Sequence, residues 1–257
     1  MTAVRPLLVL LGPTASGKSA LALFLAERLH GEILACDSAQ VYRHFDLGTA
    51  KPTAAERAVV PHHLLDLCGP SDEFTAGDYL RRGRAALEEI SARGRLPIVV
   101  AGTGLYLRAL LEGLSPLPPR SPELRARLTE RAQERGSAWL HRLLARVDSA
   151  SANEIAPQDT PKLVRALEVF FVARRPRAEL FREGRRRLEG YAVEKLGRQP
   201  DRPLLYQRIE ARVDSMLAAG WLDEARRLRD RFSDAAKPFG FLGYKQLAAH
   251  LRGEVSL

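Results

Sequence analysis

Residues 6–19 read Pro-Leu-Leu-Val-Leu-Leu-Gly-Pro-Thr-Ala-Ser-Gly-Lys-Ser and carry the strongest structural signal in the chain. The apolar run at 6–11 predicts a buried strand, because strands of a parallel sheet are covered on both faces. Apolar residues at helical spacing over 19–29, followed by Gly31, predict a helix with its end marked by glycine. A glycine-rich loop therefore connects a strand to a helix.

The loop matches the full phosphate-loop pattern, in which four residues separate a glycine from Gly-Lys-Ser. Backbone N–H groups of such a loop form an anion nest at the helix N-terminus. The pattern predicts a bound di- or triphosphate, with Lys18 reaching the terminal phosphates and Ser19 holding Mg²⁺. It does not specify ATP, and a chance match of a glycine-rich turn is the alternative. The residues expected at the phosphates are Gly12, Pro13, Thr14, Ala15, Ser16, Gly17, Lys18 and Ser19.

Strand and helix patterns continue to alternate as far as residue 114. Further strands are expected at 32–36 and 96–101, and further helices at 74–92 and 104–111. Repeated strand–helix units indicate a parallel sheet with right-handed crossovers. The predicted fold class is α/β, a P-loop NTPase-like parallel sheet flanked by helices, with a helical insertion domain.

The proline-rich stretch at 115–119 interrupts this alternation and marks a boundary. Residues 121–187 have helical patterns, with a break at 157–161 where Asp159 or Thr160 is expected to cap the next helix. Beyond residue 203 one long amphipathic helix to about 232 and a shorter one from Gly243 are expected. We therefore predict a P-loop core of residues 1–115 and 200–257 and a helical insertion of residues 116–199.

The amino-acid composition favours some classes of protein and excludes others. Forty Lys and Arg against 31 Asp and Glu give a net charge of +9, and residues 174–202 alone carry ten cations and five anions. This favours a polyanionic partner, although solvated helix faces give the same balance. The apolar content of 46% excludes a disordered chain, and two cysteines exclude a disulfide framework. We expect a reduced, cytoplasmic protein that does not enter a membrane.

Polar residues follow two of the expected strands. Asp37 ends the strand at 32–36, and Gly102-Thr103-Gly104 follows the strand at 96–101, so both open at the carboxyl edge of the sheet. Asp37 could bind metal, accept a proton or cap a turn, and the glycines could serve a simple turn. The strand at 96–101 does not end in Asp, which counts against ordinary ATP hydrolysis. Adjacent His62 and His63 would point to opposite faces of a strand, so no metal site is expected there.

Several blocks in order resemble the tRNA isopentenyltransferase, or tRNA dimethylallyltransferase, family over nearly the whole chain. The first five are Gly-Pro-Thr-Ala-Ser-Gly-Lys-Ser at 12–19, Asp-Ser-Ala-Gln-Val-Tyr at 37–42, Gly-Thr-Ala-Lys-Pro at 48–52, Pro-His-His-Leu-Leu-Asp at 61–66 and Gly-Arg-Leu-Pro-Ile-Val-Val-Ala-Gly-Thr-Gly-Leu-Tyr-Leu at 94–107. Three more follow, Arg-Ala-Leu-Glu-Val at 165–169, Gln-Arg-Ile-Glu-Ala-Arg-Val at 207–213 and Gly-Tyr-Lys at 243–245. The family usually continues with an Arg-, Lys- and Gln-rich helix beyond the residue where this sequence stops.

The resemblance implies transfer of a dimethylallyl group from dimethylallyl diphosphate to N6 of the adenine at tRNA position 37. The phosphate loop would then hold the diphosphate, and Asp37 would be the general base for the adenine amine. Charge building on the diphosphate would be stabilised by Lys18, by Ser19 with Mg²⁺, by Thr103 and by an arginine of the pair Arg208 and Arg212, of which Arg212 matches the family block better.

The resemblance also implies a bound tRNA anticodon stem-loop with its target base flipped into a pocket. Its expected contacts are Asp37, Ser38, Ala39, Gln40, Thr103, Arg125, Lys162 and Arg165. The insertion would grip tRNA through phosphate contacts that carry no sequence information, and we expect the enzyme to act as a monomer.

Two other functions share these features. A small-molecule or nucleotide kinase would use the phosphate loop for ATP and the Arg-rich insertion as a lid. A tRNA-binding homologue without activity would keep the fold and bind tRNA without prenylating it. The three functions differ in whether the protein uses ATP or dimethylallyl diphosphate as donor, and in whether a label on dimethylallyl diphosphate appears in tRNA.

Overall fold

The computed structural model describes residues 4–256, which form two compact units. The first unit comprises the chain up to Leu111 and again from Leu188, and the second comprises Glu112–Arg187. The chain leaves the first unit and returns to it at neighbouring points, because the N–H of Leu188 donates to the carbonyl of Leu111 at 2.8 Å. No helix within residues 4–256 is long and apolar enough to span a bilayer.

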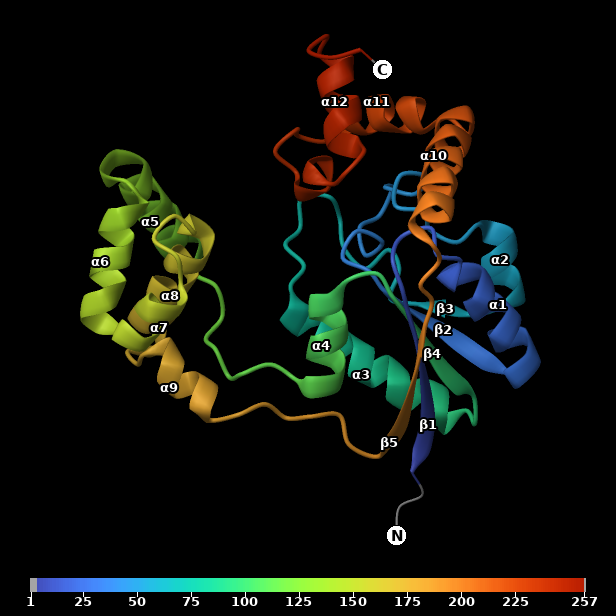
Figure 1. The fold of residues 1–257 in the computed structure, drawn as a ribbon, viewed down its shortest axis with the longest axis horizontal. Helices are drawn as coiled ribbons and strands as arrows, with labels where there is room; N and C mark the ends of the chain where they lie inside the picture. Colours follow the sequence, from blue (N-terminus) through green and yellow to red (C-terminus); the bar gives the residue numbers. More distant parts are fainter. Residues whose placement is uncertain (1–3, 257) are drawn as a thin grey trace. The chain divides into compact units, whose positions relative to one another are not determined.

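A five-stranded sheet organises the first unit (Figure 1). Its strands run in the order β3-β2-β4-β1-β5, and every neighbouring pair is parallel. Because all pairs are parallel, the carboxyl ends of β1, β2 and β4 meet at one edge. The predicted α/β fold with a parallel sheet is confirmed. The strands are β1 Arg5–Leu11, β2 Gly31–Cys36, β3 His62–His63, β4 Leu96–Ala101 and β5 Tyr191–Gly197.

Helices cover both faces of this sheet. Alternation along β1 sends Leu7 and Val9 to one face and Leu10 to the other. The first face packs against α3 and α4, and the second packs against α1, as Figure 1 shows. The helices of this unit are α1 Lys18–Leu29, α2 Ala54–Val59, α3 Ala76–Ala92, α4 Gly104–Glu112, α10 Arg202–Ala218, α11 Trp221–Arg231, the 3-10 helix η1 Lys237–Gly240 and α12 Tyr244–Leu251.

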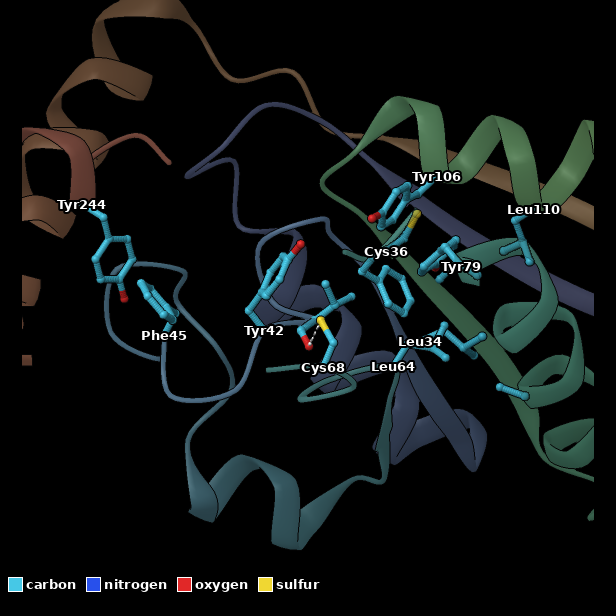
Figure 2. Packing of buried hydrophobic residues seen from close by; sticks show 14 of the residues in the cluster. Leu34, Cys36, Tyr42, Phe45, Leu64, Cys68, Tyr79, Tyr106, Leu110 and Tyr244 are labelled. Carbon is cyan, nitrogen blue, oxygen red and sulfur yellow. Dashed lines mark hydrogen bonds between the residues drawn. The ribbon is translucent and has the colours of Figure 1, made fainter. Parts of the chain in front are cut away.

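Buried aromatic rings fill the larger core beneath the carboxyl edge (Figure 2). Tyr79 of α3 and Tyr106 of α4 stack with their ring centroids 4.5 Å apart, beside Cys36 at the end of β2. The hydroxyl of Tyr79 donates to the carbonyl of Ala35 at 3.2 Å. The strand end that carries Asp37 therefore rests on a rigid aromatic layer.

Two elements differ from the sequence-based expectation. Residues 191–197 were expected in the insertion, yet β5 pairs with β1 over seven residues and lies in the sheet. Its polar residues are tolerated because β5 is an edge strand and most of its residues are exposed. The expected long helix over 204–232 is two helices, α10 and α11, separated at Gly220 with φ of 94°. The first of them, α10, begins at Arg202 with a proline in its first turn.

The second unit is helical. Its core holds Leu128, Leu140, Leu144 and Leu167, which come from three helices. Asp159 caps α8 by accepting from the N–H of Lys162, and a proline follows in the first turn, as predicted. The helices are α5 Pro122–Arg135, α6 Ser137–Val147, α7 Ser149–Glu154, α8 Thr160–Ala173 and α9 Arg177–Arg182.

Candidate active site

The phosphate loop runs from β1 into α1, and its backbone is shaped for an anion. Gly17 caps α1 with φ of 87° and no side-chain cap, so the first N–H groups of the helix keep their hydrogens for another acceptor. A Cβ at Gly12 would lie 2.8 Å from Oγ of Ser16, so only glycine fits the loop there. Oγ of Ser16 is buried without a hydrogen-bond partner in the described chain. The loop thus presents unpaired polar atoms, as a phosphate site requires.

Lys18 lies across this loop. Its Nζ donates to the carbonyl oxygens of Gly12 at 2.7 Å and Pro13 at 2.8 Å. An ammonium group has three hydrogens, so one remains for an anion. Burial, and next the guanidinium of Arg212, lower the pKa of Lys18, whereas the Asp37 carboxylate raises it. Lys18, Arg212 and Asp37 therefore interact electrostatically in one place.

Asp37 is held at the end of β2 by its own turn and by β4. Its Oδ1 accepts from the N–H of Ala39 at 2.8 Å. Its Oδ2 lies so close to Gly102 that a Cβ there would be 2.2 Å away. The glycine after β4 thus makes room for the carboxylate, and the turn uses only one of its oxygens.

Thr103 contacts the Asp37 turn directly. Its Oγ1 accepts from the N–H of Ser38 at 2.9 Å and lies 3.2 Å from Oγ of Ser38. The hydroxyl is therefore committed to the turn, which locks the ends of β2 and β4 together. Ser38, Ala39 and Thr103 are absent from the lining of the neighbouring cavity, whereas Asp37 and Gln40 belong to it.

The segment that follows, residues 40–52, forms a loop with internal bonds. Nε2 of Gln40 donates to the carbonyls of Thr49 at 3.0 Å and Ala50 at 3.1 Å. The side chain of Lys51 is 2% exposed and pairs with Asp46 at 2.7 Å and Asp66 at 2.6 Å. The loop next to Asp37 is therefore closed by a buried ammonium group.

Helices α11 and α12 hold the tip of this loop. The buried carboxylate of Glu224 accepts from the N–H groups of Asp46 at 3.3 Å and Leu47 at 3.0 Å. The hydroxyl of Tyr244 donates to Glu224 and accepts from the N–H of Gly48 at 3.1 Å. Residues almost 200 positions apart in sequence thus fix the shape of the site.

A cavity of about 1250 Å³ joins these parts. Residues 14–19 of the loop line it together with Asp37, Gln40 and Gly102, and α10 contributes Arg208 and Arg212. Gly12 and Pro13 do not line it. Arg208 is exposed and Arg212 is half-buried. Burial lowers the pKa of Arg212 and the Asp37 carboxylate raises it. Six of the eight residues predicted for the diphosphate site, those at 14–19, thus face one space with the predicted base.

Several cavity residues were not predicted, and one of them is a cation beside the phosphate loop. Arg198 follows β5 and lines the cavity beside the phosphate loop. The sequence prediction places residues 191–199 in the insertion, so it gives no reason to expect Arg198 beside the phosphate loop. Recognition of Tyr191–Gly197 as an edge strand would have placed it at the carboxyl edge.

His62 and His63 have separate hydrogen-bond partners. His63 lies 2.6 Å from the Glu32 carboxylate, and Nδ1 of His62 donates to the carbonyl of Val60 at 2.7 Å. The part of the chain that the structure describes contains no group of three His, Cys, Asp or Glu side chains suited to a metal ion.

Two of the cations expected at tRNA lie around a buried acid in the second unit. Glu168 is fully buried, and its Oε2 pairs with Arg125 and Arg165, each at 2.8 Å. Its Oε1 accepts from the N–H of Ser121 at 2.7 Å. Burial alone would raise the pKa of Glu168, but the bonds from Arg165, Ser121 and Arg125 hold it below its ordinary value. About a third of the Arg125 side chain stays exposed.

Lys162 and the rest of this unit present positive charge to solvent. The ammonium of Lys162 pairs with Asp159 at 2.5 Å, and its side chain is 68% exposed. Glu112–Arg187 carries sixteen Lys and Arg against ten Asp and Glu, a net charge of +6. This is two thirds of the excess of the whole chain, and it suits a polyanionic partner.

The family described as IPP transferase matches residues 40–257. The chain belongs to the IPP transferase family. Two curated relatives of this IPP transferase are tRNA dimethylallyltransferases of Solibacter usitatus and Koribacter versatilis, 53% and 50% identical. They match 98% and 97% of this chain and 82% and 81% of their own lengths.

Solved structures agree with the fold of this IPP transferase. A tRNA isopentenylpyrophosphate transferase of Bacillus halodurans is 36% identical with a TM-score of 0.67, over 98% of this chain and 79% of that one. A eukaryotic dimethylallyltransferase studied acting on tRNA is 27% identical with a TM-score of 0.84, over 97% of this chain and 64% of that one. The P-loop NTPase-like fold is confirmed.

Proposed function

We propose that this IPP transferase moves a dimethylallyl group from dimethylallyl diphosphate to N6 of adenine 37 in the anticodon stem-loop of tRNA. The observation that carries the proposal is one cavity that contains a phosphate loop, the Asp37 carboxylate and Arg212. An anion-binding loop beside a carboxylate suits a reaction that has a diphosphate leaving group and a proton to remove.

The donor binds by its diphosphate. The N–H groups of the loop, the remaining hydrogen of Lys18 and the guanidinium groups of Arg208 and Arg212 are its ligands. The loop fits a magnesium diphosphate, because its unpaired polar atoms are oxygens and N–H groups and the hydroxyl of Ser19 is a hard oxygen ligand. Mg²⁺ held there by Ser19 supplies charge neutralisation of the leaving group.

The transfer forms one bond, breaks one bond and releases one proton. N6 of the adenine forms a bond to C1 of the dimethylallyl group, and the C1–O bond breaks with its electron pair on diphosphate. The N6 proton moves to Asp37, of which Oδ2 takes no part in the Ala39 turn. An exocyclic amine is a weak nucleophile, so removing this proton as the bond forms assists the attack.

The adenine reaches this place only after leaving its stack. The turn formed by Asp37, Ser38 and Ala39 is fixed by Thr103, and Gln40 is fixed by its loop. In this proposal Thr103 holds the base pocket in shape, and Gln40 borders the base. The second unit holds the tRNA backbone through Lys162 and the exposed parts of Arg125 and Arg165, and a monomer suffices for the reaction.

A single-turnover assay tests the proposal. The protein is mixed with radiolabelled dimethylallyl diphosphate, Mg²⁺ and unmodified tRNA that carries adenine at position 37. A parallel reaction contains labelled ATP, and a control tRNA carries guanine at position 37. We expect label in the first tRNA alone, at the N6 position.

Three results of the same assay would contradict the proposed function. Phosphate release from ATP without label in tRNA would replace the transferase with a kinase or phosphatase. Binding of tRNA and of the donor without transfer would leave an RNA-binding homologue without activity. Equal labelling of the control tRNA would remove adenine 37 as the acceptor.

A further inference from the structure

The segment after β5 is fixed to the phosphate loop by its backbone. The N–H of Arg198 donates to the carbonyl of Leu11 at 2.8 Å. The carbonyl oxygen of Arg198 lies so close to Gly12 that a Cβ there would be 2.5 Å away. Both contacts use main-chain atoms, so they position residue 198 whatever its side chain.

The guanidinium of Arg198 lies beside the turn at which the loop becomes a helix. A Cβ built on Gly17 would be 3.4 Å from Nη1 and 3.6 Å from Cζ of Arg198. Gly17 directly precedes Lys18, the first residue of α1. The side chain lines the same cavity as Lys18 and Ser19. A guanidinium thus stands over the end of the anion nest.

Arg198 differs from Lys51 and Arg57, two other cations of this cavity, in having no side-chain partner among the described residues. Lys51 pairs with Asp46 and Asp66, and Arg57 also pairs with Asp66. Over residues 4–256 the Arg198 guanidinium makes no ion pair and no hydrogen bond, and the side chain is exposed. Its five N–H donors are therefore available to an anion in the loop.

We propose that Arg198 is a further ligand of the diphosphate, and this inference rests on the proposed function. Its planar fork binds diphosphate oxygens beside Gly17, where Lys18 reaches them from the loop. When the C1–O bond breaks, the electron pair adds one negative charge to the diphosphate. A cation fixed beside the leaving group is then favoured more in the transition state than before it. Arg198 therefore acts on the rate of transfer as well as on donor binding.

The test compares Arg198→Gln and Arg198→Lys with the matched control Arg202→Gln. Arg202 is an exposed arginine four residues further on that does not line the cavity. Each protein is assayed for the single-turnover rate with saturating donor and tRNA, and for the Kd of inorganic pyrophosphate and of tRNA. Thermal melting confirms that each variant is folded.

We expect Arg198→Gln to slow the transfer and to weaken pyrophosphate binding by roughly tenfold each, as for loss of one charge-assisted hydrogen bond. Arg198→Lys should recover part of both, because it restores the charge without the fork. Arg202→Gln should match the wild type, and tRNA affinity should be unchanged in all three variants.

Other results would overturn the inference. If the wild type transfers label and Arg198→Gln keeps its rate and its pyrophosphate affinity, Arg198 is no ligand while the proposed function stands. If tRNA affinity falls in place of pyrophosphate affinity, the guanidinium serves the RNA backbone. If the wild type transfers no label yet binds pyrophosphate through Arg198, the anion site stands and the proposed function fails.

Discussion

Asp37 has two oxygens with different tasks, and this allows its structural and chemical contributions to be separated. Its Oδ1 closes the turn with the N–H of Ala39, a bond that an asparagine carbonyl also accepts. Asp37→Asn should therefore keep the fold and pyrophosphate affinity but lower the single-turnover rate by about 10²–10⁴-fold, the usual contribution of a general base. An unchanged rate would exclude Asp37 as the base. Asp37→Ala should lose both the turn and the rate.

Gly102 is required by the same carboxylate. A Cβ at this position would lie 2.2 Å from Oδ2 of Asp37, whereas a Cβ at Gly104 meets nothing within 4 Å. Gly102→Ala should displace the carboxylate and abolish most of the transfer, and Gly104→Ala should leave it intact. Pyrophosphate binding, measured by calorimetry, should be the same in both. Equal activity of the two variants would show that the carboxylate has room to move.

At the scale of elements, the break between α10 and α11 is a backbone effect. Gly220 has φ of 94°, and a Cβ there would meet nothing within 4 Å. Gly220→Ala should therefore cost about 1 kcal/mol of folding free energy through strain alone, partly offset in the unfolded chain. For a chain of this size that lowers Tm by about 2–4 °C. A rise in Tm would mean that one continuous helix is accommodated.

The elements also show how far the sequence alone leads. The strands β1, β2 and β4 were predictable, because central strands are continuous apolar runs and the phosphate loop fixes the order of the first strand and helix. The edge strand β5 was missed, because Glu194 and Lys195 make it resemble a surface segment. Arg198 was missed with it. The single helix expected over 204–232 was wrong, because helical periodicity continues across Gly220 and only its positive φ reveals the break.

At the scale of the whole molecule, three paired carboxylates set the response to acid. Glu32, Asp66 and Glu168 are each subject to burial, which raises a carboxyl pKa, but bonds from cationic partners hold each pKa below its ordinary value. Their stabilisation is therefore complete above the unfolded pKa of about 4 and is lost as pH falls through the lower folded values. Burial lowers the pKa of His62, so we expect Tm to decline slightly as pH falls from about 7 to 5 and to fall steeply only below about pH 4.

Glu168→Gln tests how much of the acid sensitivity arises in the second unit. Loss of the charge that Arg125 and Arg165 surround should cost about 2 kcal/mol at pH 7, below the range for a fully buried pair because both arginines are partly exposed. It should also flatten the fall of Tm in acid. Glu130→Gln, at an exposed position of α5, is the control and should leave the curve unchanged. An unaltered acid slope in Glu168→Gln would place the acid sensitivity in the first unit.

This buried pairing could not be read from the sequence, because Arg125 and Glu168 are 43 positions apart.

The contacts of Glu224 and Tyr244 with residues 46–48 have a consequence for the order of synthesis. A ribosome adds about 5–20 residues per second, so roughly 10–35 s pass between the emergence of Leu47 and that of Glu224. During that time the nascent chain already carries the phosphate loop and Asp37, but the loop beside them lacks the acceptor and hydroxyl that shape it. The loop beside Asp37 thus takes its final shape only after residue 244 has been synthesised. A nascent chain that ends before residue 224 therefore lacks the contacts that shape residues 46–48.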